Sequence, residues 1–482
     1  MILTRLRFLF KSTSIYSFTS IISRTLNFFL VPLYTKIFSP NEYGELTILM
    51  SLAAILMVIL TYGFETSFLY FSSKYKNKDD IFSTSFISLL ASSLFFLSFF
   101  IFFKKKISFF LLDVNDYNLI SILTFIIFFD ILSTIPFAKI RLDGKPILFS
   151  KIKIFGVSIN IALNLFFFII CPYLHNKTFF PYNFDNIYNV EFGIGYILIS
   201  NLLSSFLVFC LLLPNILKSK LNFNVNIWKQ MFNYSFPLLI AGIAFVINEV
   251  GDRILLKMIL PNEISSFEIG VYSACYKISI FMTIFIQGFK LGFEPYFFAN
   301  KNETTKNHLS KIMNYFVAIC CFIFLFISVF IDLFKYFIQS KVYYQGLDVI
   351  PILLLSNLFL GIYFNLSVWY KTNNKTYYGA YFSLLGALIT IILNIILIPH
   401  MSYYGSAWAT LVCYITMSSI SYIYCQKLNP INYDLKKSFF YIALALLLFL
   451  IWKYTHDKKF IMSTIFSILY ILIFLKLEKK SI

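Results

Sequence analysis

Three basic side chains lie within long apolar stretches of the chain: Arg24, Arg253 and Lys277. A charged group in such a stretch normally faces a polar cavity or an oppositely charged partner, because an ion in hydrocarbon is costly. Only five of the 40 Lys and Arg residues are arginines, and a guanidinium group can hold a phosphate through two parallel hydrogen bonds. We therefore expect these side chains to form a cationic lining that binds an anionic head group.

Ion pairing within the protein is the alternative explanation for these cations. Glu249 and Arg253 are four residues apart, a spacing that brings two side chains to the same face of a helix. Four acids within apolar stretches are candidates to carry a coupling proton or sodium ion: Glu65, Asp130, Glu249 and Asp252. Burial disfavours the charged form of a carboxyl group, so such a residue can take up a proton near neutral pH. Pairing with nearby cations is again the alternative.

No group of residues has the spacing of a catalytic or metal-binding site. The seven cysteines lack the CxxC spacing of metal sites and show no disulfide framework, and the four histidines are far apart. The basic residues are spread over short segments between apolar runs, which argues against nucleic-acid binding despite the net charge of +18. We expect no metal ion, no cofactor and no enzymatic activity.

The composition is that of a membrane protein. Hydrophobic residues make up 59% of the 482 residues and charged residues 13%, with a mean hydropathy of +0.79. Soluble domains average about 25% charged residues. A soluble chain of this length must cover its surface with polar groups, whereas surface that faces lipid needs none.

Apolar runs of the length of a membrane-spanning helix recur along the whole chain. A helix of about 20 apolar residues crosses the hydrocarbon core, and this rule predicts 14 such segments. They are 13–38, 44–71, 81–103, 117–138, 147–171, 193–213, 231–259, 268–298, 312–334, 347–370, 377–399, 403–426, 438–452 and 460–475. The runs are uniformly apolar rather than alternating, which excludes membrane-spanning strands. The predicted fold class is therefore an all-α polytopic membrane protein.

The distribution of basic residues predicts the orientation. If the N-terminus is cytoplasmic, the cytoplasmic loops hold 25 of the 40 Lys and Arg residues and the outer loops hold 11. Such a bias favours cytoplasmic N- and C-termini, although Lys104, Lys105 and Lys106 then fall outside. The first run, 13–38, is too long for the apolar part of a cleaved signal peptide, so we predict that it is the first spanning helix.

An internal repeat organises the predicted helices. Asn164 and Asn394 end matching Ile-x-Leu-Asn segments at an offset of 230, and basic residues precede both segments in predicted loops, Arg141 and Lys145 in the first copy and Lys371 and Lys375 in the second. Pro40-Asn41-Glu42 recurs at 261–263, and Tyr16-Ser17-Phe18 recurs at 234–236. Two copies of a six-helix unit enter the membrane in the same sense, and the binding site is expected between them near the midplane.

We predict three parts: an N-terminal lobe over 1–222, a C-terminal lobe over 223–430, and two appended helices over 431–482. Asn164 and Asn394 are expected to form hydrogen bonds between helices, or else to contact a ligand. Five prolines in or at the ends of spans are candidates for kinks that let helices bend: Pro32, Pro136, Pro237, Pro295 and Pro351.

Several short motifs resemble those of a known group of membrane proteins. Pro32-Leu33-Tyr34, followed by Phe-Ser-Pro-Asn-Glu-Tyr-Gly at 38–44, resembles the first-helix signature of Wzx-type flippases for O-antigen and capsule units. Gly270-Val271-Tyr272-Ser273 and the stretch 391–410 are similar to other segments of that group, except that Ser406 and Trp408 replace its usual small residues. These flippases belong to the multidrug/oligosaccharidyl-lipid/polysaccharide exporter superfamily.

The resemblance implies a function for the cationic lining. It implies two six-helix lobes around a central cationic cavity in a bacterial inner membrane, plus two further helices. The expected substrate is an undecaprenyl-diphosphate-linked oligosaccharide, which moves from the cytoplasmic to the periplasmic leaflet by alternating access for cell-surface polysaccharide synthesis. The diphosphate would bind Arg24 and Arg253, and a polysaccharide polymerase complex is an expected partner.

Three alternatives stay open at this point. Ser23-Arg24 also resembles the first helix of lipid II flippases, so lipid II is an alternative cargo. Drug exporters of the same superfamily have acidic cavities for cationic drugs, whereas the candidate lining here includes several cations. A polytopic glycosyltransferase or polysaccharide polymerase would need acids in large outer loops, and the longest predicted outer loop, 172–192, has only Asp185 and Glu191.

Overall fold

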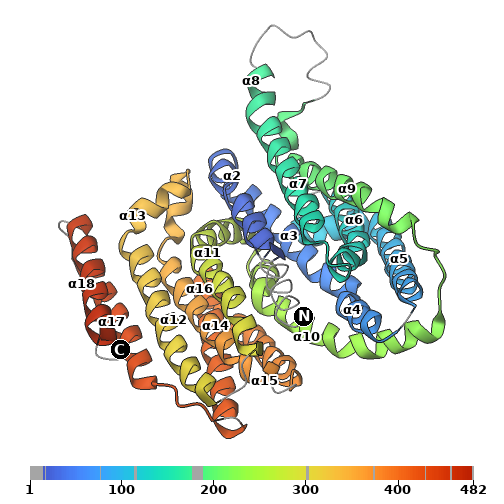
Figure 1. The fold of residues 1–482 in the computed structure, drawn as a ribbon. Helices are drawn as coiled ribbons and strands as arrows, with labels where there is room; N and C mark the ends of the chain where they lie inside the picture. The colour runs from blue at the N-terminus through green and yellow to red at the C-terminus, as the bar shows by residue number, and fades with distance from the viewer. Residues whose placement is uncertain are drawn as a thin grey trace. The chain divides into compact units, whose positions relative to one another are not determined.

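The computed structural model describes residues 15–16, 18–75, 77–112, 117–175, 188–299, 303–372, 375–428, 430–455 and 459–479. Within these ranges every regular element is a helix (Figure 1), and the predicted all-α class is confirmed. Residues 15–16 and 18–28 are helical. The longer helices that follow are α2 (Val31–Ile37), α3 (Pro40–Thr61), α4 (Phe64–Lys74), α5 (Lys78–Leu112), α6 (Tyr117–Leu142), α7 (Pro146–Leu165), α9 (Gly195–Leu217), α10 (Val225–Ile259), α11 (Asn262–Ala299), α12 (Glu303–Val329), α14 (Val349–Leu366), α16 (Tyr377–Leu428), α17 (Leu435–Tyr454) and α18 (Lys459–Lys479).

Short helical segments complete the described part of the chain. They are the π-helix η1 (Phe166–Ile170), α8 (Cys171–His175), η2 (Val190–Phe192), α13 (Ile331–Phe334), η3 (Lys335–Phe337), η4 (Lys341–Gly346) and α15 (Val368–Thr372).

Eleven helices in the described ranges are long and apolar enough to cross a membrane. One of them, α16, holds two predicted spans, because Ser402 has φ 49° and ψ −134° and divides the helix. Two predicted segments are not among the eleven. Segment 231–259 lies within α10, which carries Glu249, Asp252 and Arg253. Segment 13–38 is divided by a turn at residues 29–30, and its residues 13, 14 and 17 lie outside the described part. The total of 14 spans stays a prediction.

Two of the predicted loops are helical at their edges. Arg141, which we placed in a loop, lies in the last turn of α6, so that prediction is wrong. Lys371 likewise lies in the short helix α15. A basic side chain in the last turn of a helix interacts favourably with the unpaired carbonyl groups there, which explains why these helices continue beyond the apolar run.

Contacts divide the chain into two compact units. The first unit comprises Met1–Leu30 and Ile37–Gly270, and the second comprises Val31–Lys36 and Val271–Ile482. In the first unit α10 packs against α3, α4 and α5, while α6 contacts α5 and α9. The division therefore assigns α10 to the first unit, whereas we expected a lobe boundary at 222–223. The repeat of two six-helix lobes stays a prediction.

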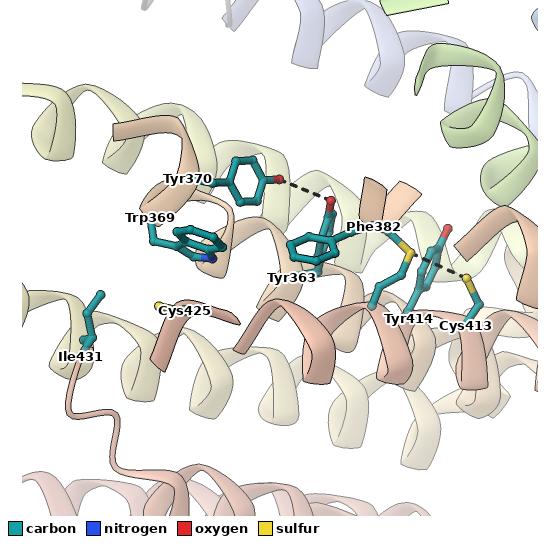
Figure 2. Packing of buried hydrophobic residues seen from close by; sticks show 9 residues of the cluster. Tyr363, Trp369, Tyr370, Phe382, Cys413, Tyr414, Cys425 and Ile431 are labelled. Atoms are coloured by element: carbon teal, nitrogen blue, oxygen red, sulfur yellow. Dashed lines mark hydrogen bonds between the residues drawn. The ribbon is translucent and has the colours of Figure 1, made fainter. Parts of the chain in front are cut away.

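The second unit is built around α14 and α16, which pack closely, and α12, which contacts α14, α17 and α18. Its core includes a cluster of nine buried residues, five of which are aromatic (Figure 2). Within this cluster the hydroxyl groups of Tyr363 and Tyr370 lie 3.3 Å apart. The predicted appended helices α17 and α18 are joined at Glu478, whose Oε1 accepts a 2.7 Å hydrogen bond from Tyr441 and lies 2.7 Å from Lys437 Nζ.

The motif at 38–44 forms the start of α3. Ser39 is the N-cap residue, and Pro40 follows in the first turn. The backbone N–H of Ser39 donates to Glu42 Oε2 at 2.9 Å, while the N–H of Glu42 donates to Ser39 Oγ at 3.4 Å. This reciprocal capping satisfies two donors that a helix start leaves unpaired, so Ser39 and Glu42 have a structural role in the motif.

The glycine of the same motif permits a close helix crossing. A Cβ atom on Gly44 would collide with the backbone carbonyl of Ser266 in α11, and one on Gly270 would collide with the carbonyl of Pro40. The backbones of α3 and α11 therefore approach directly, which small residues allow in membrane proteins. Both glycines belong to motifs that carry the family resemblance.

The prolines differ in their effect on the helices. Pro136 lies inside α6 and Pro237 inside α10, where each removes a backbone hydrogen bond. Pro32 and Pro351 lie in the first turns of α2 and α14, where a proline costs no such bond. Pro136 and Pro237 therefore keep the predicted role as kink positions, and for Pro295, which lies within α11, that role stays a prediction.

Candidate functional site

Arg253 is buried and paired within its own helix. The residue is 4% exposed, and its Nη1 donates to Asp252 Oδ1 at 2.6 Å and to the backbone carbonyl of Glu249 at 2.8 Å. Asp252 is also 4% exposed, whereas the Glu249 side chain is exposed. The carboxylate partner of Arg253 is thus Asp252, and the Glu249 side chain is not the partner that the spacing suggested.

The same end of α10 holds a second buried cation. Lys257 is 5% exposed, and its Nζ donates to Ser265 Oγ of α11 at 3.1 Å. Tyr43 of α3 lies within electrostatic range of Arg253. This cluster joins α3, α10 and the start of α11 next to the crossing at Gly44, so pairing within the protein accounts for the position of Arg253.

Arg24 has a different environment. It lies in the helical stretch 18–28 and its side chain is exposed. No hydrogen bond or ion pair joins it to another described residue. A lone guanidinium group in the middle of an apolar helix needs a polar or anionic partner from outside its own helix. Lys277 lies on α11 in the second unit and is half-buried. A lining shared by Arg24, Arg253 and Lys277 stays a prediction.

Two of the predicted coupling acids have basic neighbours in the first unit. Glu65, in the first turn of α4, forms an ion pair with Arg141 in the last turn of α6. Asp130 of α6 forms a hydrogen bond with Ser205 of α9 and lies within electrostatic range of Lys153 of α7. These contacts agree with the alternative that the acids pair with cations inside the protein. Lys153 could not be predicted as a neighbour of Asp130, because no helical spacing relates the two positions.

The two matched asparagines form hydrogen bonds inside the protein. Asn164 Nδ2 donates to the Asn160 carbonyl at 2.8 Å, and Asn394 Nδ2 donates to the Thr390 carbonyl at 2.7 Å. Both asparagines are fully buried. Ser406 Oγ also donates to Asn394 Oδ1 at 2.7 Å, which joins the two halves of α16. Asn394 therefore links the two halves of α16, whereas Asn160, which accepts from Asn164, lies on the same helix, α7.

We expect Ser406→Ala to lower stability by about 1 kcal/mol, because it leaves Asn394 Oδ1 without this donor. Thermal unfolding of the purified protein in detergent measures the effect. Ser421→Ala is the matched control: Ser421 is equally buried on the same helix, and its hydroxyl has no hydrogen-bond partner. Equal unfolding temperatures for the two variants would contradict the role of Ser406.

In the described ranges, no three His, Cys, Asp or Glu side chains gather in a way that could hold a metal ion. Of the predicted outer loop 172–192, residues 176–187, including Asp185, lie outside the described part. The charged residues within the helices are therefore the candidates for a functional site in the described ranges.

The chain is similar to two sequence families. Residues 9–289 match a family model described as polysaccharide biosynthesis protein, and residues 253–396 match the MatE model. No curated protein sequence matches the chain.

Solved structures of membrane transporters have the same fold. The lipid II flippase MurJ, in an inward closed conformation, is 17% identical over 97% of this chain and 99% of that chain, with a TM-score of 0.76. An inward-facing multidrug resistance MATE family transporter of the MOP superfamily is 12% identical over 86% of this chain and 94% of that chain, with a TM-score of 0.63. A MOP superfamily transporter from Pyrococcus furiosus is 12% identical over 87% of this chain and 95% of that chain, with a TM-score of 0.58. At these identities the likeness shows the fold: a multi-pass helical membrane protein.

Proposed function

Because the chain belongs to the polysaccharide biosynthesis protein family of the MOP superfamily, we propose that it is a flippase for a lipid-linked oligosaccharide. The substrate is an undecaprenyl-diphosphate-linked oligosaccharide. It moves from the cytoplasmic to the periplasmic leaflet of the bacterial inner membrane by alternating access. The product then supplies cell-surface polysaccharide synthesis, in which a polysaccharide polymerase complex is the expected partner. Both termini are cytoplasmic in this proposal.

Arg24 is the observation that supports this proposal most directly. It is an exposed cation in an apolar helix and forms no ion pair with a described residue. A diphosphate offers several oxygens to a guanidinium group, which binds phosphate through two parallel hydrogen bonds. In this proposal Arg24 binds the diphosphate within the membrane, and Lys277 and Arg253 are the further candidates for this lining.

In this proposal the coupling ion binds to the acids on α4, α6 and α10. Glu65 and Asp130 lie between helices and next to cations, so a proton or sodium ion would compete with Arg141 or Lys153 for the carboxylate. Competition of this kind links ion binding to helix packing, because the lost ion pair loosens the contact between the helices. Glu249 and Asp252 are the further candidates on α10.

Lipid analysis of a deletion strain tests the proposed function. Without the protein, the undecaprenyl-linked units should accumulate in the cytoplasmic leaflet, where a label that cannot cross the membrane does not reach them. Plasmid-borne wild-type protein should restore labelling from outside. A normal leaflet distribution combined with loss of polymer would instead indicate an enzyme that acts after transport, and would contradict the proposal.

Lipid II is the second candidate cargo, because the chain shares its fold with a lipid II flippase over 97% of its length. Reconstituted vesicles distinguish the two substrates. A flippase for oligosaccharide units should move labelled undecaprenyl-diphosphate oligosaccharide and leave lipid II in place. A drug exporter of the same superfamily should move neither lipid.

A further inference from the structure

The first unit contains a cavity of about 460 Å³ between the end of α3, the face of α5 and the start of α10. It is open to the surroundings rather than enclosed. Pockets that hold small ligands have volumes of about 300–1,000 Å³, so the cavity is large enough for a ligand. Its lining residues are Tyr62, Ile87, Ser88, Ala91, Ser92, Phe223, Trp228 and Phe232.

The polar groups of the cavity bind one another. The hydroxyl groups of Tyr62 and Ser88 are hydrogen-bonded at 2.6 Å, and Trp228 Nε1 donates to Ser88 Oγ at 2.8 Å. Ser92 also forms a hydrogen bond with Tyr62. A sugar or an ion would have to break these bonds, which is unfavourable for buried polar groups. The surfaces left for a ligand are aromatic rings and aliphatic side chains, which suit a hydrocarbon chain.

Two walls of the cavity are helix faces. Trp228 and Phe232 are four residues apart on α10, and their rings stack with centroids 5.2 Å apart. Ile87 and Ala91 are likewise four apart on α5, so they share a face of that helix. Two helices that pack on each other therefore form most of the cavity, and Tyr62 and Phe223 complete it from the non-helical segments next to α3 and α10.

Five exposed lysines, which we call the basic rim, lie where α4 and α9 end and where α5 and α10 begin: Lys74, Lys78, Lys218, Lys220 and Lys229. Lys78 begins α5, and Ser88 lies about 15 Å further along the helix axis. Asp79 and Asp80 lie at the same end, and Asp79 is paired with Lys139 at 3.6 Å. An apolar cavity below a basic rim matches a lipid whose head group is strongly negative. On the predicted orientation this end faces the cytoplasm.

We propose that this cavity binds a segment of the polyprenyl tail of the transported lipid while its diphosphate lies at the basic rim on the cytoplasmic side. The inference rests on the proposed function, because that function supplies the polyprenyl diphosphate. The tail fills the space between Ala91 and the Trp228–Phe232 stack. Burial of apolar surface contributes most of the binding energy, and the lysines favour a diphosphate over the singly charged head of a phospholipid.

Ala91→Trp tests the cavity by filling it. Native mass spectrometry of the purified full-length protein in detergent measures retention of the probe, undecaprenyl diphosphate, with phosphatidylglycerol as the competing lipid. We expect Ala91→Trp to reduce probe retention at least tenfold without changing phosphatidylglycerol retention. Ser98→Trp is the matched control, because Ser98 lies two turns along the same face of α5 and is exposed; it should retain the probe like the wild type. Ile87→Trp fills the cavity from the neighbouring turn and is the second variant if Ala91→Trp does not fold.

Each outcome decides the proposal. Wild-type retention of the probe by folded Ala91→Trp or Ile87→Trp overturns it, as does an equal loss of probe and phosphatidylglycerol, which would make the cavity a general phospholipid site. The leaflet-labelling experiment on the deletion strain reports separately on the flippase function. Loss of probe binding in Ala91→Trp together with normal leaflet distribution in the deletion strain would leave a polyprenyl site on a protein with another function.

Discussion

Arg24→Ala should lower the rate of substrate export by a factor of about 30 to 100, with normal amounts of protein in the membrane. Hydrogen bonds to a charged group contribute about 2–3 kcal/mol, and each 1.4 kcal/mol corresponds to about a tenfold change. The effect should be this large because the guanidinium group is exposed and has no ion pair within the described chain that competes with the substrate. Leaflet-specific labelling of the lipid-linked units measures the rate.

Two further variants separate binding from general effects of charge. Arg24→Lys keeps the positive charge but loses the planar fork, so its export rate should lie between those of the wild type and Arg24→Ala. Lys36→Ala removes another exposed cation from the same predicted segment and should leave export unchanged. Unchanged export in Arg24→Ala would remove this residue from the proposed site.

Gly44→Ala should prevent normal accumulation of the protein, or lower its stability by about 3 kcal/mol or more. The added methyl group would collide with the backbone carbonyl of Ser266. A backbone atom cannot rotate away as a side chain can, so α3 and α11 have to separate. The buried Lys257–Ser265 contact lies beside this crossing and would be disturbed as well. Membrane protein levels and thermal unfolding in detergent measure the effect.

Gly288→Ala is the matched control for this prediction. Gly288 lies on the same helix, α11, but a Cβ atom there meets nothing within 4 Å. Replacing a helical glycine with alanine stabilises a helix by up to about 1 kcal/mol, so this variant should be at least as stable as the wild type. If Gly44→Ala were equally stable, the close helix crossing would be wrong.

The helices were largely predictable because hydropathy dominates their sequence. A run of about 20 apolar residues in a membrane has to satisfy its own backbone hydrogen bonds, and a helix does so. The errors lie at the ends of runs, where polar residues continue a helix. α6 continues to Leu142 beyond its apolar run. α10 begins at Val225, six residues before the predicted span. Hydropathy predicts the part of a helix that faces lipid, and the helix itself extends beyond that part.

The site was less predictable because its contacts depend on side-chain direction and on distant partners. Helical spacing suggested Glu249 as the partner of Arg253, yet the adjacent Asp252 accepts the hydrogen bond. Adjacent residues point to different sides of a helix, so only the side-chain conformations of this pair bring them together. The meeting of Gly44 with Gly270 joins positions far apart in the chain, and no local pattern contains that information.

The joint between α17 and α18 has a practical consequence for handling the protein. Glu478 lies in the final turn of the last described helix and accepts a hydrogen bond from Tyr441 while it pairs with Lys437. A version of the chain shortened by even five residues would lose this carboxylate and leave a buried tyrosine hydroxyl without its acceptor. We expect α18 to lose its contact with α17 at a lower temperature in a shortened chain, so the unfolding of such a chain would report on its damaged end.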